Sequence, residues 1–171
     1  MNNLWGDITV FEEIDTPKDI IEEQASIFNG IKGNLASINV SKRILTNSGK
    51  KVFQSYKDDY DVDADFIYSF ELESQLLADY SYEVFTIYYG IKFYPLCISL
   101  SNGIADELGE YLDKNVELLD WDEHRYIVED ETAFTELLEM ILTTKELAVI
   151  IRNMNILAKE QMDAKDTVEI E

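Results

Sequence analysis

Residues 66–100 read FIYSFELESQLLADYSYEVFTIYYGIKFYPLCISL, and this stretch decides the fold. In its first eight residues, aromatic and aliphatic side chains occupy every second position: Phe66, Tyr68, Phe70 and Leu72. A period of two places successive side chains on opposite faces of a strand, and aromatic and β-branched residues favour strands. We therefore expect strands at 66–73, 81–89 and 91–100, forming the centre of an antiparallel sheet. Because Pro95 cannot donate a backbone hydrogen bond, it predicts an edge, a bulge or a strand start.

A helix is predicted to begin at Thr16, in the sequence Thr16-Pro17-Lys18-Asp19. Threonine is a good N-cap, proline suits the first helical position, and a carboxylate in the first turn interacts favourably with the helix dipole. Apolar residues follow near helical spacing at Ile20, Ile27, Phe28 and Ile31. Gly30 or Gly33 is expected to end this helix in a left-handed conformation.

The next segment predicts a β-hairpin. Apolar residues alternate at Ile38, Val40 and Ile44, and Thr46-Asn47-Ser48-Gly49 then supplies turn-forming residues before Val52.

Two helices are expected at the carboxyl end, after a short helix at 104–112 and a short strand at 126–128. Asp130 can cap the first, whose apolar stripe is Phe134, Leu137, Leu138, Ile141 and Leu142. Thr143 and Glu146 form a capping-box pattern for the second, starting at Thr144. Its apolar residues cover more than one stripe, so it is either deeply buried or shared with a second subunit.

These elements predict an α+β fold: an antiparallel sheet of about five to six strands with an N-terminal helix and a C-terminal helix pair packed on it. We expect residues 1–160 to form a single domain and residues 161–171 to form a frayed acidic tail. A chain of 171 residues with 46% hydrophobic content can build a core without a disulfide or metal. Cys97 is its only cysteine and is expected to be a small buried hydrophobe.

The overall charge excludes several partners. The formal net charge is −21, with a pI near 4.2, so phosphate backbones and anionic membranes are repelled. The amino terminus lacks the pattern of a signal peptide, and no apolar run approaches the roughly 20 residues that span a bilayer. We expect a cytoplasmic protein without direct binding to nucleic acid or membrane.

The charge is unevenly distributed along the chain. Six basic residues and no acidic one occur between Lys32 and Lys57, whereas residues 58–139 contain 22 acids and three bases. The hairpin would carry four cations near its tip: Lys42, Arg43, Lys50 and Lys51. Such a tip could bind phosphate or an acidic partner, neutralise acids of its own fold or of a neighbouring copy, or protect a strand edge.

Two groups of acids are candidate binding residues. The first group has an aspartate at every second position: Asp59, Asp61, Asp63 and Asp65. The second group would share one face of a helix: Asp106, Glu110 and Asp113. The first group lacks the glycine and the final glutamate of an EF-hand calcium loop. Regular negative charge on a rigid scaffold can imitate a phosphate backbone; the alternatives are a solvated acidic loop and an ordinary exposed helix face.

Signs of catalysis are weak. His124 is the only histidine, and no nucleophile elbow, zinc-binding or phosphate-binding motif occurs, so no catalytic, cofactor-binding or metal-binding residue is assigned. The leading interpretation is a non-catalytic module without cofactor that binds a basic protein surface, inhibiting a nucleic-acid-binding protein by phosphate mimicry. One alternative is a structural protein that self-associates as a homo-oligomer through the basic hairpin or the final helix. Another is an enzyme with a divalent metal on Asp120, Asp122, Glu123 or His124.

Overall fold

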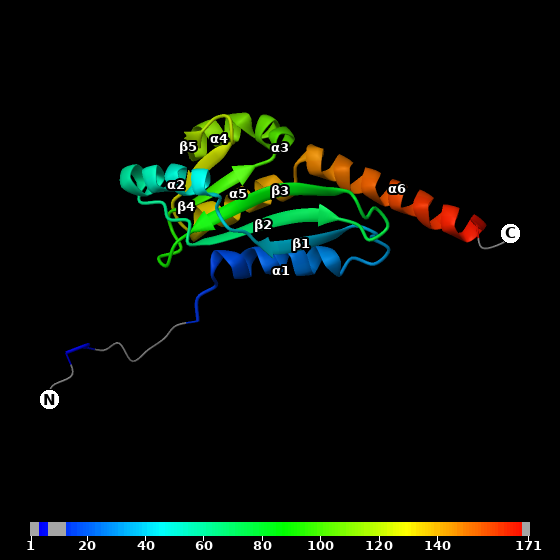
Figure 1. Ribbon diagram of the computed structural model, residues 1–171, viewed down its shortest axis with the longest axis horizontal. Coiled ribbons are helices and arrows are strands. Elements are labelled where there is room, and N and C mark those ends of the chain that lie inside the picture. The colour runs from blue at the N-terminus through cyan, green and yellow to red at the C-terminus, as the bar shows by residue number, and fades with distance from the viewer. Residues whose placement is uncertain (1–3, 7–12, 169–171) are drawn as a thin grey trace.

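Six antiparallel strands form one sheet with helices on both faces in the computed structural model, which describes residues 4–6 and 13–168 (Figure 1). The strand order is β1-β2-β3-β4-β6-β5. The elements in chain order are α1 (Pro17–Asn29), β1 (Ser37–Lys42), α2 (Asn47–Tyr60), β2 (Phe66–Glu73), β3 (Ser81–Tyr89), β4 (Leu96–Leu100), α3 (Asn102–Glu107), α4 (Gly109–Asn115), β5 (Glu117–Asp120), β6 (Arg125–Val128), α5 (Glu131–Leu142) and α6 (Lys145–Val168). The predicted α+β fold is confirmed.

The strands predicted from alternation form the middle of the sheet. Phe70 pairs with Phe85 between β2 and β3, and Phe85 pairs with Leu100 between β3 and β4. The last predicted strand is shorter than expected, because it begins at Leu96, directly after Pro95. The edge strand β5 is an element that the periodicity did not predict.

One face of the sheet carries the main core. Helices α1 and α5 pack there, and α3, α4 and the first part of α6 extend the same core. The largest completely buried side chains include Phe70, Phe85 and Phe134. Burial of this apolar surface is the main stabilising contribution to the fold.

Helix α1 begins as predicted. The Thr16 Oγ1 accepts a hydrogen bond from the Asp19 amide at 3.1 Å, and the Asp19 Oδ2 accepts one from the Thr16 amide at 2.9 Å. These two bonds form a capping box, and the bond from the Thr16 amide lowers the pKa of Asp19 because it favours the ionised carboxylate. The helix ends at Gly30 in a right-handed conformation, whereas Gly33 has a φ of 79° in the following turn.

The predicted hairpin is wrong, because residues 47–60 form helix α2. The Thr46 hydroxyl accepts from the Gly49 amide at 3.1 Å, so the residues that resemble a hairpin turn are the N-cap and first turn of a helix. Lys42 and Arg43 therefore lie at the end of β1 and just after it, while Lys50 and Lys51 lie on α2.

Helix α2 packs on the sheet face opposite the main core. Its Phe53 and Tyr56 form a second cluster with Cys97 and Ile127. Alternation along β6 separates the two faces, since Tyr126 belongs to the main core and Ile127 to the cluster beneath α2.

Helices α5 and α6 are capped in different ways. The Asp130 Oδ1 accepts from the Ala133 amide at 2.8 Å and caps α5, as predicted. The predicted capping box between Thr143 and Glu146 is not formed. Instead, the Glu107 carboxylate of α3 accepts from the amides of Lys145 and Glu146 at 2.8 and 3.0 Å. These two bonds lower the pKa of Glu107 and fix the start of α6 against α3.

Helix α6 lies partly on the core and partly beyond it. Leu147, Met154 and Ala158 are buried, and the carboxyl-terminal part extends past the end of the sheet (Figure 1). The helix continues to Val168, beyond the start of the predicted tail, and residues 169–171 lie outside the described part of the chain. None of the helices described is both long and apolar enough to cross a membrane.

The outer edge of β1 is partly occupied by a side chain. The Asn29 amide group at the end of α1 donates to the Ile38 carbonyl at 2.9 Å and accepts from the Ile38 amide at 2.7 Å. A side chain thus makes the pair of hydrogen bonds that a neighbouring strand would make.

Candidate functional site

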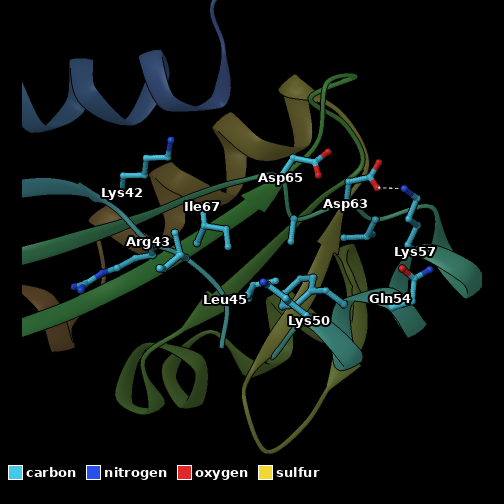
Figure 2. A pocket seen from close by; sticks show the side chains of 13 residues that line it. Lys42, Arg43, Leu45, Lys50, Gln54, Lys57, Asp63, Asp65 and Ile67 are labelled. Carbon is cyan, nitrogen blue, oxygen red and sulfur yellow. Dashed lines mark ion pairs between the residues drawn. The ribbon is translucent and has the colours of Figure 1, made fainter. Parts of the chain in front are cut away.

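A groove lined by basic side chains lies between α2 and the adjoining ends of β1 and β2 (Figure 2). Its volume is about 640 Å³, within the range of ligand-binding clefts. We call it the basic groove. Its walls include four of the six basic residues of the basic segment 32–57: Lys42, Arg43, Lys50 and Lys57.

The groove forms because α2 connects β1 to β2. The helix leads the chain away from the end of β1 and back to the adjoining start of β2. Strand β1 ends at Lys42, and α2 ends at Asp61, which adopts a left-handed conformation with a φ of 57°. Residues 62–65 then lead into β2. A Cβ on Gly90 would lie 2.6 Å from the Cβ of Asp63, so a glycine is required where this connection crosses the end of β3.

Two of the four cations are neutralised by neighbouring carboxylates. Arg43 pairs with Glu71, and its Nε donates to the Ser69 hydroxyl at 2.7 Å. The Lys57 Nζ lies 3.1 Å from the Asp63 Oδ1 at one end of the groove (Figure 2), and this pairing raises the pKa of Lys57.

The other two groove cations lack such partners. None of the ion pairs within residues 4–6 and 13–168 involves Lys42 or Lys50. The only carboxylates that line the groove are Asp63 and Asp65, so its cationic side chains outnumber the anionic ones by two. This positive excess is unusual on a chain with 35 acidic and 14 basic residues.

The inner wall of the groove is apolar. Phe53, Val62 and Ile67 are buried, whereas Ile44 at the rim is 89% exposed. The groove therefore combines cationic walls with a hydrophobic floor.

Arg125 supports helix α2 from below. Its guanidinium carbon lies 5.3 Å from the centre of the Phe53 ring and 5.9 Å from that of Tyr88, distances typical of cation–π contacts. Its Nε is buried and has no hydrogen-bond partner among the described residues. Burial raises the pKa of Tyr88 and raises that of the nearby Cys97 thiol, which is completely buried, to about 12.

The two predicted groups of acids lie on opposite faces of the sheet. Asp59 is on α2, and Asp61, Asp63 and Asp65 are in the connection that follows it. Their stretch is not extended, so the every-second-residue spacing does not place the four carboxylates in one row. The Asp61 Oδ2 lies 3.6 Å from the Lys92 Nζ.

The second group lies on α3 and α4, and two further acids lie close to these helices. Burial of the Tyr126 hydroxyl raises its pKa, and the nearby carboxylates of Asp113 and Asp106 raise it further. We define the α3–α4 acidic face as five side chains from four helices: Asp106, Glu110, Asp113, Glu136 and Glu146.

The two added residues are contributed by the final helices. Glu136 of α5 raises the pKa of Tyr111 on α4, in addition to the effect of burial. A Cβ on Gly103 would lie 2.4 Å from the Glu146 Oε1, so the Glu146 carboxylate lies directly against α3.

Asp120 and His124 contact neighbouring residues around the segment that joins β5 to β6. The Tyr56 hydroxyl donates to the Asp120 Oδ2 at 3.4 Å, and the Asp120 Oδ1 accepts from the Glu123 amide at 3.1 Å. His124 has a φ of 47° and contacts the Trp121 ring edge-on. Among the residues described, no three His, Cys, Asp or Glu side chains are grouped so that they could hold a metal ion.

No protein family, curated protein or solved structure matches this chain. Function is therefore inferred from its geometry and charge.

Sequence reasoning identified the basic residues but missed the groove that they line. It also missed Arg125, because a single arginine after an acidic segment carries no local signal of contact with the Phe53 and Tyr88 rings. Glu107 was missed for a related reason, since the helix that it caps begins 38 residues later in the chain.

Proposed function

We propose that this protein is a non-catalytic binding module whose α3–α4 acidic face occupies a basic surface on another macromolecule, as a phosphate backbone would. The observation that carries the proposal is that acidic side chains of four helices border α3 and α4: Asp106 and Asp113 lie near Tyr126, Glu136 near Tyr111 and Glu146 against Gly103. Among the five, only Glu110 has an ion-pair partner in the part of the chain described, the Lys114 ammonium at 2.9 Å.

The supporting helices are rigidly held. Ile104 and Ala105 of α3 and Leu112 of α4 are buried, and Glu107 ties α3 to the start of α6. A fixed set of negative charges costs less to order on binding than a flexible acidic tail does. The charge also destabilises the folded state through self-repulsion, and a binding function explains why it is retained.

Affinity capture followed by binding measurements tests this proposal. We expect the wild-type protein to bind a basic protein that duplex DNA also binds, with DNA competing. Affinity should fall at least tenfold between about 50 and about 200 mM salt, because exposed charges are screened. The triple variant Asp106→Asn, Glu110→Gln and Asp113→Asn should lose at least tenfold in affinity.

A matched variant controls for net charge. Asp79→Asn, Asp122→Asn and Glu129→Gln remove the same charge at exposed positions outside the α3–α4 acidic face. Equal weakening by both variants, or binding that DNA does not compete with, would contradict phosphate mimicry by this face. The parallel variant Asp59→Asn, Asp61→Asn and Asp65→Asn tests the other acidic group.

Self-association through α6 is a second candidate, favoured by exposed apolar side chains along the helix. Val149, Ile156, Leu157 and Met162 are between 40% and 51% exposed. If they pair with a second copy, sedimentation equilibrium should give a dimer in moderate salt. Ile156→Glu with Leu157→Glu should give a monomer, whereas Lys159→Glu with Lys165→Glu, which reverses two exposed charges on the same helix, should leave the dimer intact. A wild-type monomer at all concentrations would exclude this candidate.

A further inference from the structure

We propose that the basic groove is a second binding site, which takes an extended acidic segment of another protein. This inference does not depend on the proposed function, because it concerns the opposite face of the sheet and the opposite charge. It follows from three properties of the groove: unpaired cations, an apolar lining with an exposed side chain at the rim, and acidic surroundings.

The unpaired cations supply the attraction. Lys42 and Lys50 belong to different elements and line the same groove without a carboxylate partner. Arg43 and Lys57 are held by Glu71 and Asp63, so their positions are fixed by the fold. A ligand with carboxylates at two positions could pair with both free lysines while leaving these internal ion pairs intact.

The apolar floor supplies the second requirement. Phe53, Val62 and Ile67 lie between the charged walls, and the exposed Ile44 stands at the rim. A purely anionic ligand would leave this surface unused. Since the floor residues are at most 4% exposed, the apolar surface open to a ligand is mainly that of Ile44, which is 89% exposed. A segment with an apolar side chain between its carboxylates would cover Ile44 and remove apolar surface from water.

The surrounding charge selects an extended segment over a folded acidic surface or a nucleic acid. At physiological salt, charges interact over a Debye length of about 8 Å. An extended segment can occupy the groove and meet mainly its lysines. A folded acidic protein, including a second copy of this chain, brings many more carboxylates against a molecule of charge −21. A nucleic acid has regularly spaced phosphates that would extend beyond the groove onto acidic surroundings.

Fluorescence anisotropy with a defined probe tests the proposal. The probe is a labelled peptide of alternating glutamate and leucine, added to the full chain, and the control peptide has glutamine in place of glutamate. We expect the acidic peptide to bind, with affinity falling as salt increases, and the glutamine peptide to bind at least tenfold more weakly.

Variants locate the site. Lys42→Gln with Lys50→Gln should weaken peptide binding at least tenfold, because it removes both unpaired cations and leaves both ion pairs. The matched variant Lys145→Gln with Lys159→Gln removes the same charge from exposed positions on α6 and should bind as the wild type does. Thermal melting of both variants checks that the fold is retained.

Three outcomes would overturn the proposal: equal weakening by the two double variants, equal binding of the two peptides, or stronger binding of a single-stranded oligonucleotide than of the acidic peptide. The α3–α4 acidic face variant should bind the peptide as well as the wild type does. Peptide binding by the basic groove and binding of a basic partner by the α3–α4 acidic face are thus measured with different variants and different probes.

Discussion

Phe85→Ala is expected to lower the free energy of unfolding by about 3 to 5 kcal/mol, the range measured for removing a buried phenylalanine. Phe85 is completely buried on the central strand β3, and its ring stacks on that of Phe70 with centroids 4.7 Å apart and an interplanar angle of 10°. Truncation would leave a cavity between two strands and remove the aromatic contact. Since small domains are stable by only about 5 to 15 kcal/mol, this is a large share of the total.

Urea unfolding followed by fluorescence or circular dichroism measures the loss. Phe85→Leu should cost less than about 1.5 kcal/mol, because it keeps most of the apolar volume. Tyr80→Ala, at a position 49% exposed, should change stability by no more than about 0.5 kcal/mol. A Phe85→Ala protein as stable as Tyr80→Ala would show that the stacked pair is not part of the core.

Arg125→Ala is expected to lower the free energy of unfolding by about 2 to 3 kcal/mol, through loss of two cation–π contacts and a cavity beneath α2. The guanidinium lies against the rings of Phe53 and Tyr88, which stack on each other with centroids 4.5 Å apart, and it adds to the apolar contacts that hold α2 on the sheet. Labelling of Cys97 by a thiol reagent should therefore become faster, because opening of α2 exposes this buried thiol.

Two further variants separate packing from charge. Arg125→Met should recover at least half of the loss, because methionine fills the gap and introduces no partly desolvated charge. Arg152→Ala removes an exposed arginine from α6 and should leave both stability and Cys97 labelling unchanged within error. Unchanged labelling in Arg125→Ala would mean that α2 is held by contacts other than Arg125.

Local signals predicted most of the sheet and the caps of two helices. Alternation identified β2 and β3, because strands with one buried face impose a period of two on the sequence. Thr16 and Asp130 predicted helix starts, since N-capping depends on residues three positions apart. Predictions of this kind require only neighbours in the chain.

The error at residues 42–51 arose because Thr46-Asn47-Ser48-Gly49 suits both a hairpin turn and a helix start. The Thr46 hydroxyl satisfies the Gly49 amide, and the helix then buries Phe53 and Tyr56 against the far face of the sheet. That burial depends on Cys97 and Ile127, which are distant in sequence. Tertiary packing therefore decided between two locally acceptable structures.

The candidate sites were predicted only in part, for the same reason. The basic residues were identified by composition, but their arrangement around a groove depends on the return of α2 to β2. The α3–α4 acidic face includes Glu136 and Glu146, which reach it through the packing of α5 and α6 and share no sequence spacing with Asp106.

The Asn29 side chain has a consequence for aggregation. An unprotected edge strand is a template on which another chain can add, and such addition leads to fibrils. Here one amide group already satisfies both backbone groups of Ile38, so an incoming strand must first displace it. The opposite edge is the four-residue strand β5, whose register shifts between Leu118 and Asp120, and short irregular edges are poor templates. Both edges of the sheet thus discourage fibril growth, and the charged surfaces remain available for specific binding.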